Sequence, residues 1–210
     1  MIKHIIFDFN GTLINDVKLC LDLLNETLNN QGKQGIDLIK YRNIFTFPIK
    51  DYYIAAGIDF NIESYESLAI KFIKKYQPLS LRCGLYEGAY EALKYLNDKK
   101  YSLYILSASE KNNLLEQCKS YNIDKYFKEI LGITNIHAAS KVDIGLDFIK
   151  RNNVKKEEVL FIGDTLHDYE VATSMGVECA LVKCGHQSED ILAKANVKIY
   201  NSIADLMEVF

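Results

Sequence analysis

The sequence predicts an α/β protein in which a parallel sheet lies between two layers of helices and a helical block follows the first strand. The apolar run at residues 2–7 ends abruptly at Asp8, as buried strands of parallel sheets do. Helical periodicity without a strand pattern then fills residues 15–82. From Gly84 onward helices and strands alternate, which indicates right-handed βαβ units. The chain of 210 residues has room for this core and one insertion.

The inserted block is expected to contain four helices. Apolar residues recur at helical spacing over residues 15–31, 37–43, 48–57 and 63–76. Gly32 suits the end of the first helix and Asp37 the start of the second. Pro48 fits the first turn of the third helix, which Gly57 would end. Pro78 is expected to end the fourth, because proline removes a backbone donor and clashes with the preceding turn.

The alternating part of the chain supplies the remaining elements. The expected strands cover residues 101–106, 129–133, 159–162 and 177–182, with a short strand near 197. The expected helices cover residues 86–96, 110–121, 141–151 and 166–174, and a weak helix and a terminal helix finish the chain. Open sheets of this kind bind their ligands at the carboxyl ends of the strands.

Composition and charge exclude several classes of protein. The formal net charge of -3 and the pI of about 5.8 give no basic surface for nucleic acid, and charges of both signs are interspersed. No apolar stretch is long enough to cross a bilayer, and the N-terminal apolar run is too short for a signal peptide. The five cysteines are scattered without a Cys-x-x-Cys pair. We therefore expect a cytoplasmic protein that binds neither nucleic acid nor membrane.

Polar side chains stand where three of the expected strands end. Asp8 follows the first strand, Ser107 the second, and Asp164 and Asp168 the fourth, while Lys141 begins the preceding helix. If these strands are neighbours, the side chains meet at one crevice. A buried carboxylate there must be hydrated, paired or bound to a metal ion. Carboxylates can hold a hard dication, and hydroxyl and ammonium groups can bind phosphoryl oxygens.

The order of these motifs carries a family resemblance. The motifs are Asp8-Phe9-Asn10-Gly11-Thr12-Leu13, Ser107, Lys141 and Gly163-Asp164-Thr165-Leu166-His167-Asp168. The chain resembles the haloacid dehalogenase-like (HAD) hydrolase superfamily, most closely its phosphoglycolate phosphatase-like branch with a helical C1-type cap. The resemblance implies a Rossmann-like three-layer core over residues 1–14 and 83–210 and a cap domain over residues 15–82. It also implies a phosphatase that acts on a small phosphorylated metabolite.

The resemblance further implies how the reaction would be carried out. Asp8 would be the nucleophile and would form an aspartyl-phosphate. Mg²⁺ would be bound by the carboxylates of Asp8 and Asp164 and by the main-chain carbonyl of Asn10. Asp168 would orient a metal-bound water or Lys141.

A cradle for the phosphoryl group is implied in the same way. Ser107 would donate a hydrogen bond to it, and Lys141 would neutralise charge on the nucleophile and the phosphate. Backbone N–H groups after Asp8, in the loop that includes Phe9, Asn10 and Thr12, and at Ala108 would complete the cradle. The sequence favours neither a monomer nor a weak dimer.

Asn10 departs from the family's usual pattern, which has an Asp two residues after the nucleophile. That Asp protonates the leaving oxygen and later activates water, work worth about a hundred- to ten-thousand-fold in rate. An amide cannot exchange a proton at neutral pH. Four explanations stay open: a substrate with a good leaving group, replacement by His167, a slow or inactive phospho-metabolite binder, or phosphonate hydrolysis with Lys50 as a Schiff base. We favour the first, and a non-catalytic sensor is the alternative from a different class.

Other residues with possible chemistry are expected to be structural. His4, His137 and His186 have no partner at ligand spacing. Aromatic residues of the inserted block are expected to form the core of the cap rather than to contact substrate: Tyr41, Phe45, Phe47, Tyr52 and Tyr53.

Overall fold

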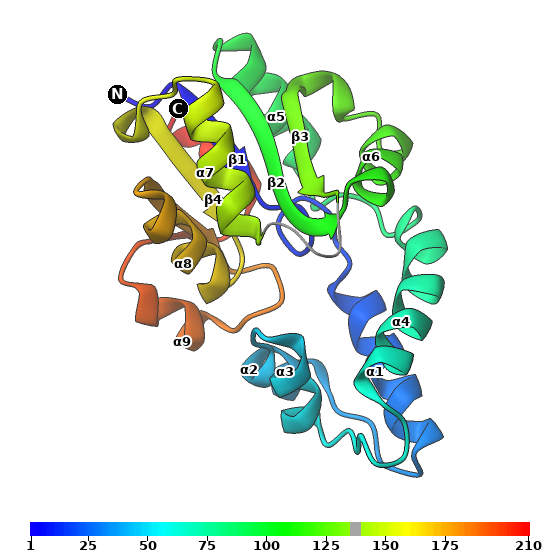
Figure 1. Ribbon diagram of the computed structural model, residues 1–210. Helices are drawn as coiled ribbons and strands as arrows, with labels where there is room; N and C mark the ends of the chain where they lie inside the picture. The colour runs from blue at the N-terminus through cyan, green and yellow to red at the C-terminus, as the bar shows by residue number, and fades with distance from the viewer. Residues whose placement is uncertain (135–139) are drawn as a thin grey trace.

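The computed structural model describes residues 1–134 and 140–210, and a parallel sheet forms its centre (Figure 1). The six strands are β1 (His4–Phe7), β2 (Ser102–Glu110), β3 (Phe127–Ile133), β4 (Val159–Gly163), β5 (Glu178–Val182) and β6 (Lys198–Tyr200). Their order across the sheet is β3-β2-β1-β4-β5-β6, and each of these pairings is parallel. β1 therefore lies inside the sheet with β2 and β4 as its neighbours.

Helices cover both faces of the sheet, so the three-layer α/β prediction is confirmed (Figure 1). One face carries α5 (Ala89–Asp98) and α6 (Lys111–Ser120), and the other carries α7 (Lys141–Arg151) and α8 (Leu166–Met175). Alternate residues of β1 separate the two hydrophobic cores, because successive side chains of a strand point to opposite faces. Ile5 and Phe7 pack on the side of α5 and α6, and Ile6 packs on the side of α7 and α8.

The inserted block contains the four expected helices, which lie beyond the carboxyl ends of the strands in Figure 1. They are α1 (Val17–Asn30), α2 (Leu38–Ile44), α3 (Ile49–Ala56) and α4 (Tyr65–Ser80). Asp37 caps α2 by accepting a hydrogen bond from the backbone N of Lys40, and Gly57 ends α3 with a φ of 105°. The four helices share a hydrophobic core of their own around Tyr41 and Tyr52.

The two connections between block and sheet lie side by side. Ile14 forms an antiparallel bridge with Leu85, and the backbone N of Asn15 donates to the carbonyl of Gly84 at 3.0 Å. The chain therefore leaves the sheet and returns to it at the same place. The domain limits at residues 14/15 and 82/83 remain our prediction.

The prediction that Pro78 ends α4 was wrong, because the helix continues to Ser80. Contacts with α6 hold this last turn. The Ser80 hydroxyl accepts a hydrogen bond from Gln117 Nε2 at 2.7 Å, and its carbonyl accepts one from the Tyr121 hydroxyl. Proline costs the last turn only one backbone hydrogen bond, and these tertiary bonds offset that loss.

Two further elements differ from the prediction. β2 continues past residue 106 to Glu110, because it pairs with β3 again at Ile133 after an irregularity. Ser107 therefore lies within a strand rather than after its end. The chain closes with α9 (Glu189–Leu192) and a 3₁₀ helix (Ile203–Glu208) in place of a terminal α-helix. No helix in residues 1–134 and 140–210 has the length and hydrophobicity that a membrane span requires.

Candidate active site

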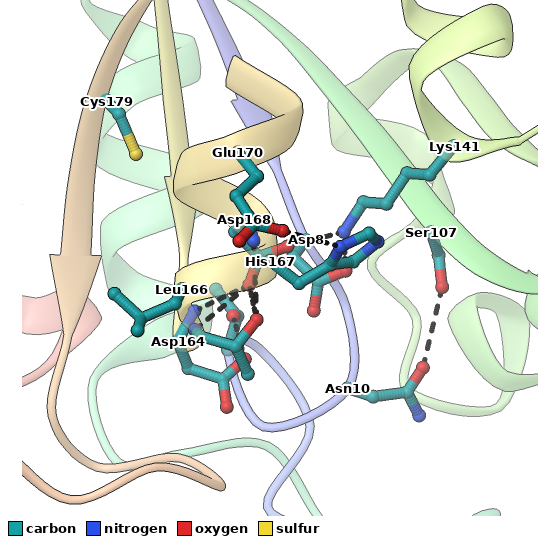
Figure 2. A network of polar contacts seen from close by, with 12 residues as sticks. Asp8, Asn10, Ser107, Lys141, Asp164, Leu166, His167, Asp168, Glu170 and Cys179 are labelled. Carbon is teal, nitrogen blue, oxygen red and sulfur yellow. Dashed lines mark hydrogen bonds and ion pairs between the residues drawn. The ribbon is translucent and has the colours of Figure 1, made fainter. Parts of the chain in front are cut away.

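Asp8 lies directly beyond β1, next to a buried lysine (Figure 2). The pairing of β1 with β4 fixes its backbone, since its N–H donates to the carbonyl of Ile162 at 2.8 Å. Lys141, the first residue of α7, places Nζ 2.5 Å from Asp8 Oδ1 and 2.6 Å from Asp168 Oδ1. At most 10% of each of these three side chains is exposed. One ammonium thus bridges two carboxylates that are shielded from water.

The start of α8 positions Asp168. Its Oδ2 accepts hydrogen bonds from the backbone N of Asp164 at 3.1 Å, the backbone N of Thr165 at 3.0 Å and the Thr165 hydroxyl at 2.7 Å. Thr165 accepts in return from the backbone N of Asp168, which makes a reciprocal capping box. Gly163 is needed before it, because a Cβ there would lie 2.3 Å from Asp168 Cβ. These bonds leave Oδ1 for Lys141.

Asp164 is held from two other parts of the chain. Its Oδ1 accepts a hydrogen bond from the Thr12 hydroxyl at 3.0 Å, and its Oδ2 accepts one from the backbone N of His186 at 2.7 Å. Thr12 is fully buried, and its side chain contacts Asp164 rather than the cavity described below. The Thr12 hydroxyl therefore orients a carboxylate.

The three carboxylates carry more negative charge than Lys141 can balance. Burial raises the pKa of Asp8 to about 8; the Lys141 charge opposes this shift, and Asp168 and Asp164 add to it. Burial also raises the pKa of Asp164 to about 6, although the charge of His186 acts against it. Burial would raise the pKa of Asp168 too, but the Lys141 ammonium outweighs burial and holds that pKa below its usual range.

A hard dication would fit this cluster. One oxygen from each of Asp8, Asp164 and Asp168 lies within 4.8 Å of the others. The donors are all oxygen, the kind of ligand that Mg²⁺ prefers, and a positive ion would offset the excess negative charge. The chemistry of the residues is therefore consistent with the Mg²⁺ site expected from the sequence.

The residues expected to bind the phosphoryl group lie around Asp8. Ser107 is buried, with its hydroxyl 3.5 Å from Asn10 Oδ1 and accepting from the backbone N of Ser109 at 3.1 Å. Ala108 is exposed and lines the cavity. The Phe9 side chain is fully buried in the core on the α5 and α6 side. Only the main chain of Phe9 could therefore face a phosphate.

The side chain of Asn10 is hydrogen-bonded at both ends. Its Nδ2 donates to the Tyr76 hydroxyl at 2.5 Å and to Asp16 Oδ2 at 3.1 Å, and its Oδ1 accepts from the Ser109 hydroxyl at 3.0 Å. The Tyr76 hydroxyl also donates to Asp16 Oδ2 at 2.6 Å. Asn10 therefore joins the loop after β1 to α4, and an amide suits this place because it can donate to an ionised Asp16.

His186 has no partner at ligand spacing in the sequence, but in the structure it has partners from distant parts of the chain. It is buried, with Nδ1 2.8 Å from the Tyr41 hydroxyl and Nε2 3.3 Å from Asp16 Oδ1. Burial would lower the pKa of His186, but the charge and hydrogen bond of Asp16 raise it. No short stretch of sequence reveals the contacts of Asp16 and His186, because the partners are far apart in the chain. Tyr41 and His186, for example, are separated by 145 residues. His137 lies outside the described residues.

A cavity of about 490 Å³ separates the sheet edge from the inserted block. Polar groups on the sheet side include Asp8, Asn10, Ser107, Lys141, Asp164 and Asp168. Aromatic rings on the block side are those of Tyr41, Phe45, Phe47, Tyr52, Tyr53, Tyr65, Phe72 and Tyr76. Several of these rings belong to the hydrophobic core of the block, as expected, but they line the cavity as well.

Lys50 was considered as a Schiff base and His167 as a replacement for the missing acid, and the two residues lie in different places. The Lys50 side chain is exposed, its Nζ lies 5.5 Å from the centre of the Phe60 ring, and it does not line the cavity. His167 lines the cavity and stacks on Phe47 with ring centres 4.5 Å apart. His4 lies beside Tyr104, with Nδ1 3.4 Å from its hydroxyl, and does not line the cavity.

Comparison with known proteins gives a consistent result. The sequence profile of the family described as haloacid dehalogenase-like hydrolase matches residues 5–182. "Pyrophosphatase PpaX" of Listeria welshimeri is 27% identical over 174 residues, which cover 80% of this chain and 77% of that protein. "Phosphoglycolate phosphatase 1" of Pseudomonas aeruginosa is 21% identical over 213 residues, which cover 98% of this chain and 78% of that protein.

A solved structure has the same fold. A haloacid dehalogenase-like family hydrolase from Streptococcus pneumoniae superposes with a TM-score of 0.83 at 20% identity. The superposition covers 100% of this chain and 98% of that one, so it includes the sheet and the helical block.

Proposed function

The chain belongs to the haloacid dehalogenase-like hydrolase family, and we propose that it is a Mg²⁺-dependent phosphatase that hydrolyses small phosphomonoesters through Asp8. The observation that carries the proposal is the group at the cavity floor, in which Lys141 bridges Asp8 and Asp168 with Asp164 alongside. Relatives named for pyrophosphate and phosphoglycolate hydrolysis support a phosphorylated substrate.

Asp8 would act as the nucleophile. One carboxylate oxygen attacks phosphorus, so that an O–P bond forms to Asp8 while the bond from phosphorus to the leaving oxygen breaks. Lys141, 2.5 Å away, favours the ionised carboxylate and neutralises charge on the phosphoryl oxygens. The Ser107 hydroxyl and the backbone N–H groups of Phe9, Asn10 and Ala108 would donate to the same oxygens. Positioning and charge stabilisation supply most of the acceleration in phosphoryl transfer.

The metal would be held by the carboxylates of Asp8 and Asp164 and by the main-chain carbonyl of Asn10. When bound, Mg²⁺ supplies positive charge next to the transferring phosphoryl group. Asp168 positions the Lys141 ammonium, because its Oδ1 lies 2.6 Å from Nζ while its Oδ2 is fixed by α8. A water molecule would then cleave the aspartyl-phosphate, which releases inorganic phosphate and restores the Asp8 carboxylate.

The inserted block would serve as a cap that closes over the phosphoryl group. Arg42 of α2 donates to the carbonyls of Gly185 at 3.0 Å and Cys184 at 2.8 Å, and Gln187 Nε2 donates to the carbonyl of Phe45 at 2.8 Å. These bonds tie the block to the loop after β5. Closure of this kind excludes water and strengthens the electrostatic interactions inside.

The proposal is tested by Mg²⁺-dependent release of inorganic phosphate from acetyl phosphate, a small activated substrate. We expect turnover by the wild type and background rates for Asp8→Asn, because an amide is a far weaker nucleophile than a carboxylate. Asp22→Asn is the matched control, since Asp22 is exposed and pairs with Lys18 one turn away on α1, and it should retain the wild-type rate. Binding without turnover in the wild type would instead identify a sensor, and aldehyde release from a phosphonate would identify a Schiff-base enzyme.

A further inference from the structure

The side of the cavity that faces away from Asp8 is built from aromatic rings. Phe45 and Phe47 come from the end of α2 and the turn after it, Tyr52 and Tyr53 from α3, and Tyr65 and Phe72 from α4. Tyr52 and Tyr53 are mostly buried in the core of the block, which limits their movement. A wall of fixed rings stacks best on another flat ring. This wall is where the leaving group of a phosphomonoester would lie if its phosphorus is next to Asp8.

Among the described residues, the cavity offers no free lysine or arginine side chain to a negatively charged leaving group. Lys141 is the sole lysine or arginine among the described residues that line it, and both Asp8 and Asp168 already contact its ammonium. Residues 135–139, outside the described part, contain neither lysine nor arginine in the sequence. Glu110 adds an exposed carboxylate to the lining. A second negative charge on the substrate would be buried without a partner, which is costly.

Two histidines among the described residues line the cavity. His167 stacks on Phe47, and its Nδ1 lies 3.6 Å from Glu170 Oε2. The other histidine, whose pKa is raised, does not supply the missing charge. His186 has one ring nitrogen 3.3 Å from Asp16 Oδ1 and the other 2.8 Å from the Tyr41 hydroxyl. Its charge is therefore compensated by Asp16 inside the protein. Asp16 in turn accepts hydrogen bonds from Tyr76 and the backbone N of Gly11.

The groups around Asn10, where the family's usual acid would stand, have no free proton to give. The Asn10 amide donates to Asp16 and Tyr76, and the hydroxyls of Ser109 and Tyr76 donate to Asn10 and Asp16. An alkoxide leaving from this place would have to depart unprotonated, which is slow. A phenoxide is a much weaker base, so it can leave with the electron pair of the broken P–O bond and take a proton from water afterwards.

These two independent observations, the uncharged aromatic wall and the lack of a free proton donor around Asn10, point to the same substrate. We infer that the enzyme hydrolyses aryl phosphates, monoesters whose leaving group is a single uncharged aromatic ring seated among the rings of the cap. A cavity of about 490 Å³ has the size of a small-molecule site and accommodates a phosphoryl group with one ring. The inference rests on the proposed phosphatase function.

A series of five substrates tests both observations at once. Phenyl phosphate has the flat uncharged ring, cyclohexyl phosphate has a ring of similar size but a poor leaving group, and 4-carboxyphenyl phosphate adds a negative charge to the aryl group. Phosphoglycolate is a charged alkyl ester, and acetyl phosphate needs neither the ring pocket nor an acid. We expect kcat/KM for phenyl phosphate to exceed that for each of cyclohexyl phosphate, 4-carboxyphenyl phosphate and phosphoglycolate by about a hundredfold or more.

The outcomes separate this inference from the proposed function. Turnover of acetyl phosphate with a preference for phosphoglycolate over phenyl phosphate would overturn the aryl inference and leave the phosphatase proposal intact. A rate for 4-carboxyphenyl phosphate equal to that for phenyl phosphate would also overturn it, because the carboxylate makes the phenol a slightly better leaving group. No Mg²⁺-dependent release from any substrate would contradict the phosphatase proposal itself.

A charge placed in the aromatic wall gives a second test. Ile73 of α4 lines the cavity and is 51% exposed, so arginine fits there, whereas Ile70 on the same helix is 70% exposed and does not line the cavity. Ile73→Arg should raise the ratio of kcat/KM for 4-carboxyphenyl phosphate to that for phenyl phosphate by about tenfold. Ile70→Arg should leave the ratio unchanged. An equal change in both variants, or no change in Ile73→Arg, would contradict the placement of the leaving group.

Discussion

The two sides of the cavity differ in how they are built. On the sheet side every carboxylate has named partners: Asp168 receives four hydrogen bonds or ion contacts from Lys141, Asp164 and Thr165, and Asp164 is held by Thr12 and His186. On the cap side the rings contact one another and lack charge. Buried charges tolerate little change because each unpaired group is costly, while apolar contacts vary smoothly with area. In the proposed phosphatase, the reaction and the choice of substrate would therefore depend on two surfaces that differ in how much change they tolerate.

The largest effect is expected from replacing Lys141, whose ammonium group lies on the sheet side of the cavity. Lys141→Gln would leave Asp8 and Asp168 buried next to each other, so we expect a loss of stability of about 3–5 kcal/mol in the absence of metal. The rate of phosphate release should fall by about a thousandfold, because the protein loses the positive charge that would face the phosphoryl oxygens. Urea unfolding and phosphate release measure the two effects. Lys50→Gln is the control, and a loss of activity in that exposed variant would revive the Schiff-base alternative.

A carboxylic acid at the boundary between the two sides should change the preference for leaving groups. Asn10→Asp places a carboxyl about where Asn10 Nδ2 now lies, 3.1 Å from Asp16 Oδ2, and the two acids would share a proton. We expect cyclohexyl phosphate turnover to rise by about a hundredfold and phenyl phosphate turnover to change little. Asn43→Asp, an exposed site on α2, is the control. Equal increases in turnover of cyclohexyl phosphate and phenyl phosphate would show that the effect of Asn10 is not limited to the lack of an acidic proton.

Metal should stabilise the sheet side in a pH-dependent way. Without metal, the native state holds a proton on Asp8 up to about pH 8, whereas an unfolded carboxyl of ordinary pKa, 3.8, releases it. The free energy of unfolding should therefore fall as pH rises between these values. Mg²⁺ should offset this fall, by about 2–3 kcal/mol at a hundredfold excess over its dissociation constant.

The same measurement has an internal control. In Asp8→Asn the group that titrates is gone, so the decrease in stability with pH should be smaller and the effect of Mg²⁺ weaker. Urea unfolding at several pH values, with Mg²⁺ or EDTA, measures both. A wild type whose stability responds to neither pH nor Mg²⁺ would argue against metal binding at this cluster.

The smallest effect is expected on the cap side. Phe72→Leu removes one ring of the wall but keeps it apolar, so kcat/KM for phenyl phosphate should fall by less than about tenfold. Phe60→Leu removes a cap ring that does not line the cavity and should leave kcat/KM unchanged. If Phe72→Leu lowered kcat/KM as much as Lys141→Gln, the cap side would be as sensitive to substitution as the sheet side.

Short stretches of sequence were enough to predict the fold class and the carboxylate cluster on the sheet side of the cavity. Strand ends are local features: the apolar run before Asp8, the Gly-Asp-Thr turn after β4 and the capping box at Asp168 are legible in short stretches. Parallel strands bring their carboxyl ends to one edge, so these side chains had to meet once the strands were neighbours. The inserted helices were equally visible, because amphipathic periodicity and the caps at Asp37 and Gly57 are local as well.

The surroundings of those groups depend on contacts between distant parts of the chain, which no short stretch of sequence reveals. The contacts of His186 with Tyr41 and Asp16, the bond from Asn10 to Tyr76 and the continuation of α4 past Pro78 join residues far apart in the chain. The charge and shape of the cap side depend on which helix faces turn toward the cavity. Packing between the block and the sheet sets those faces, and no single stretch of sequence encodes that packing.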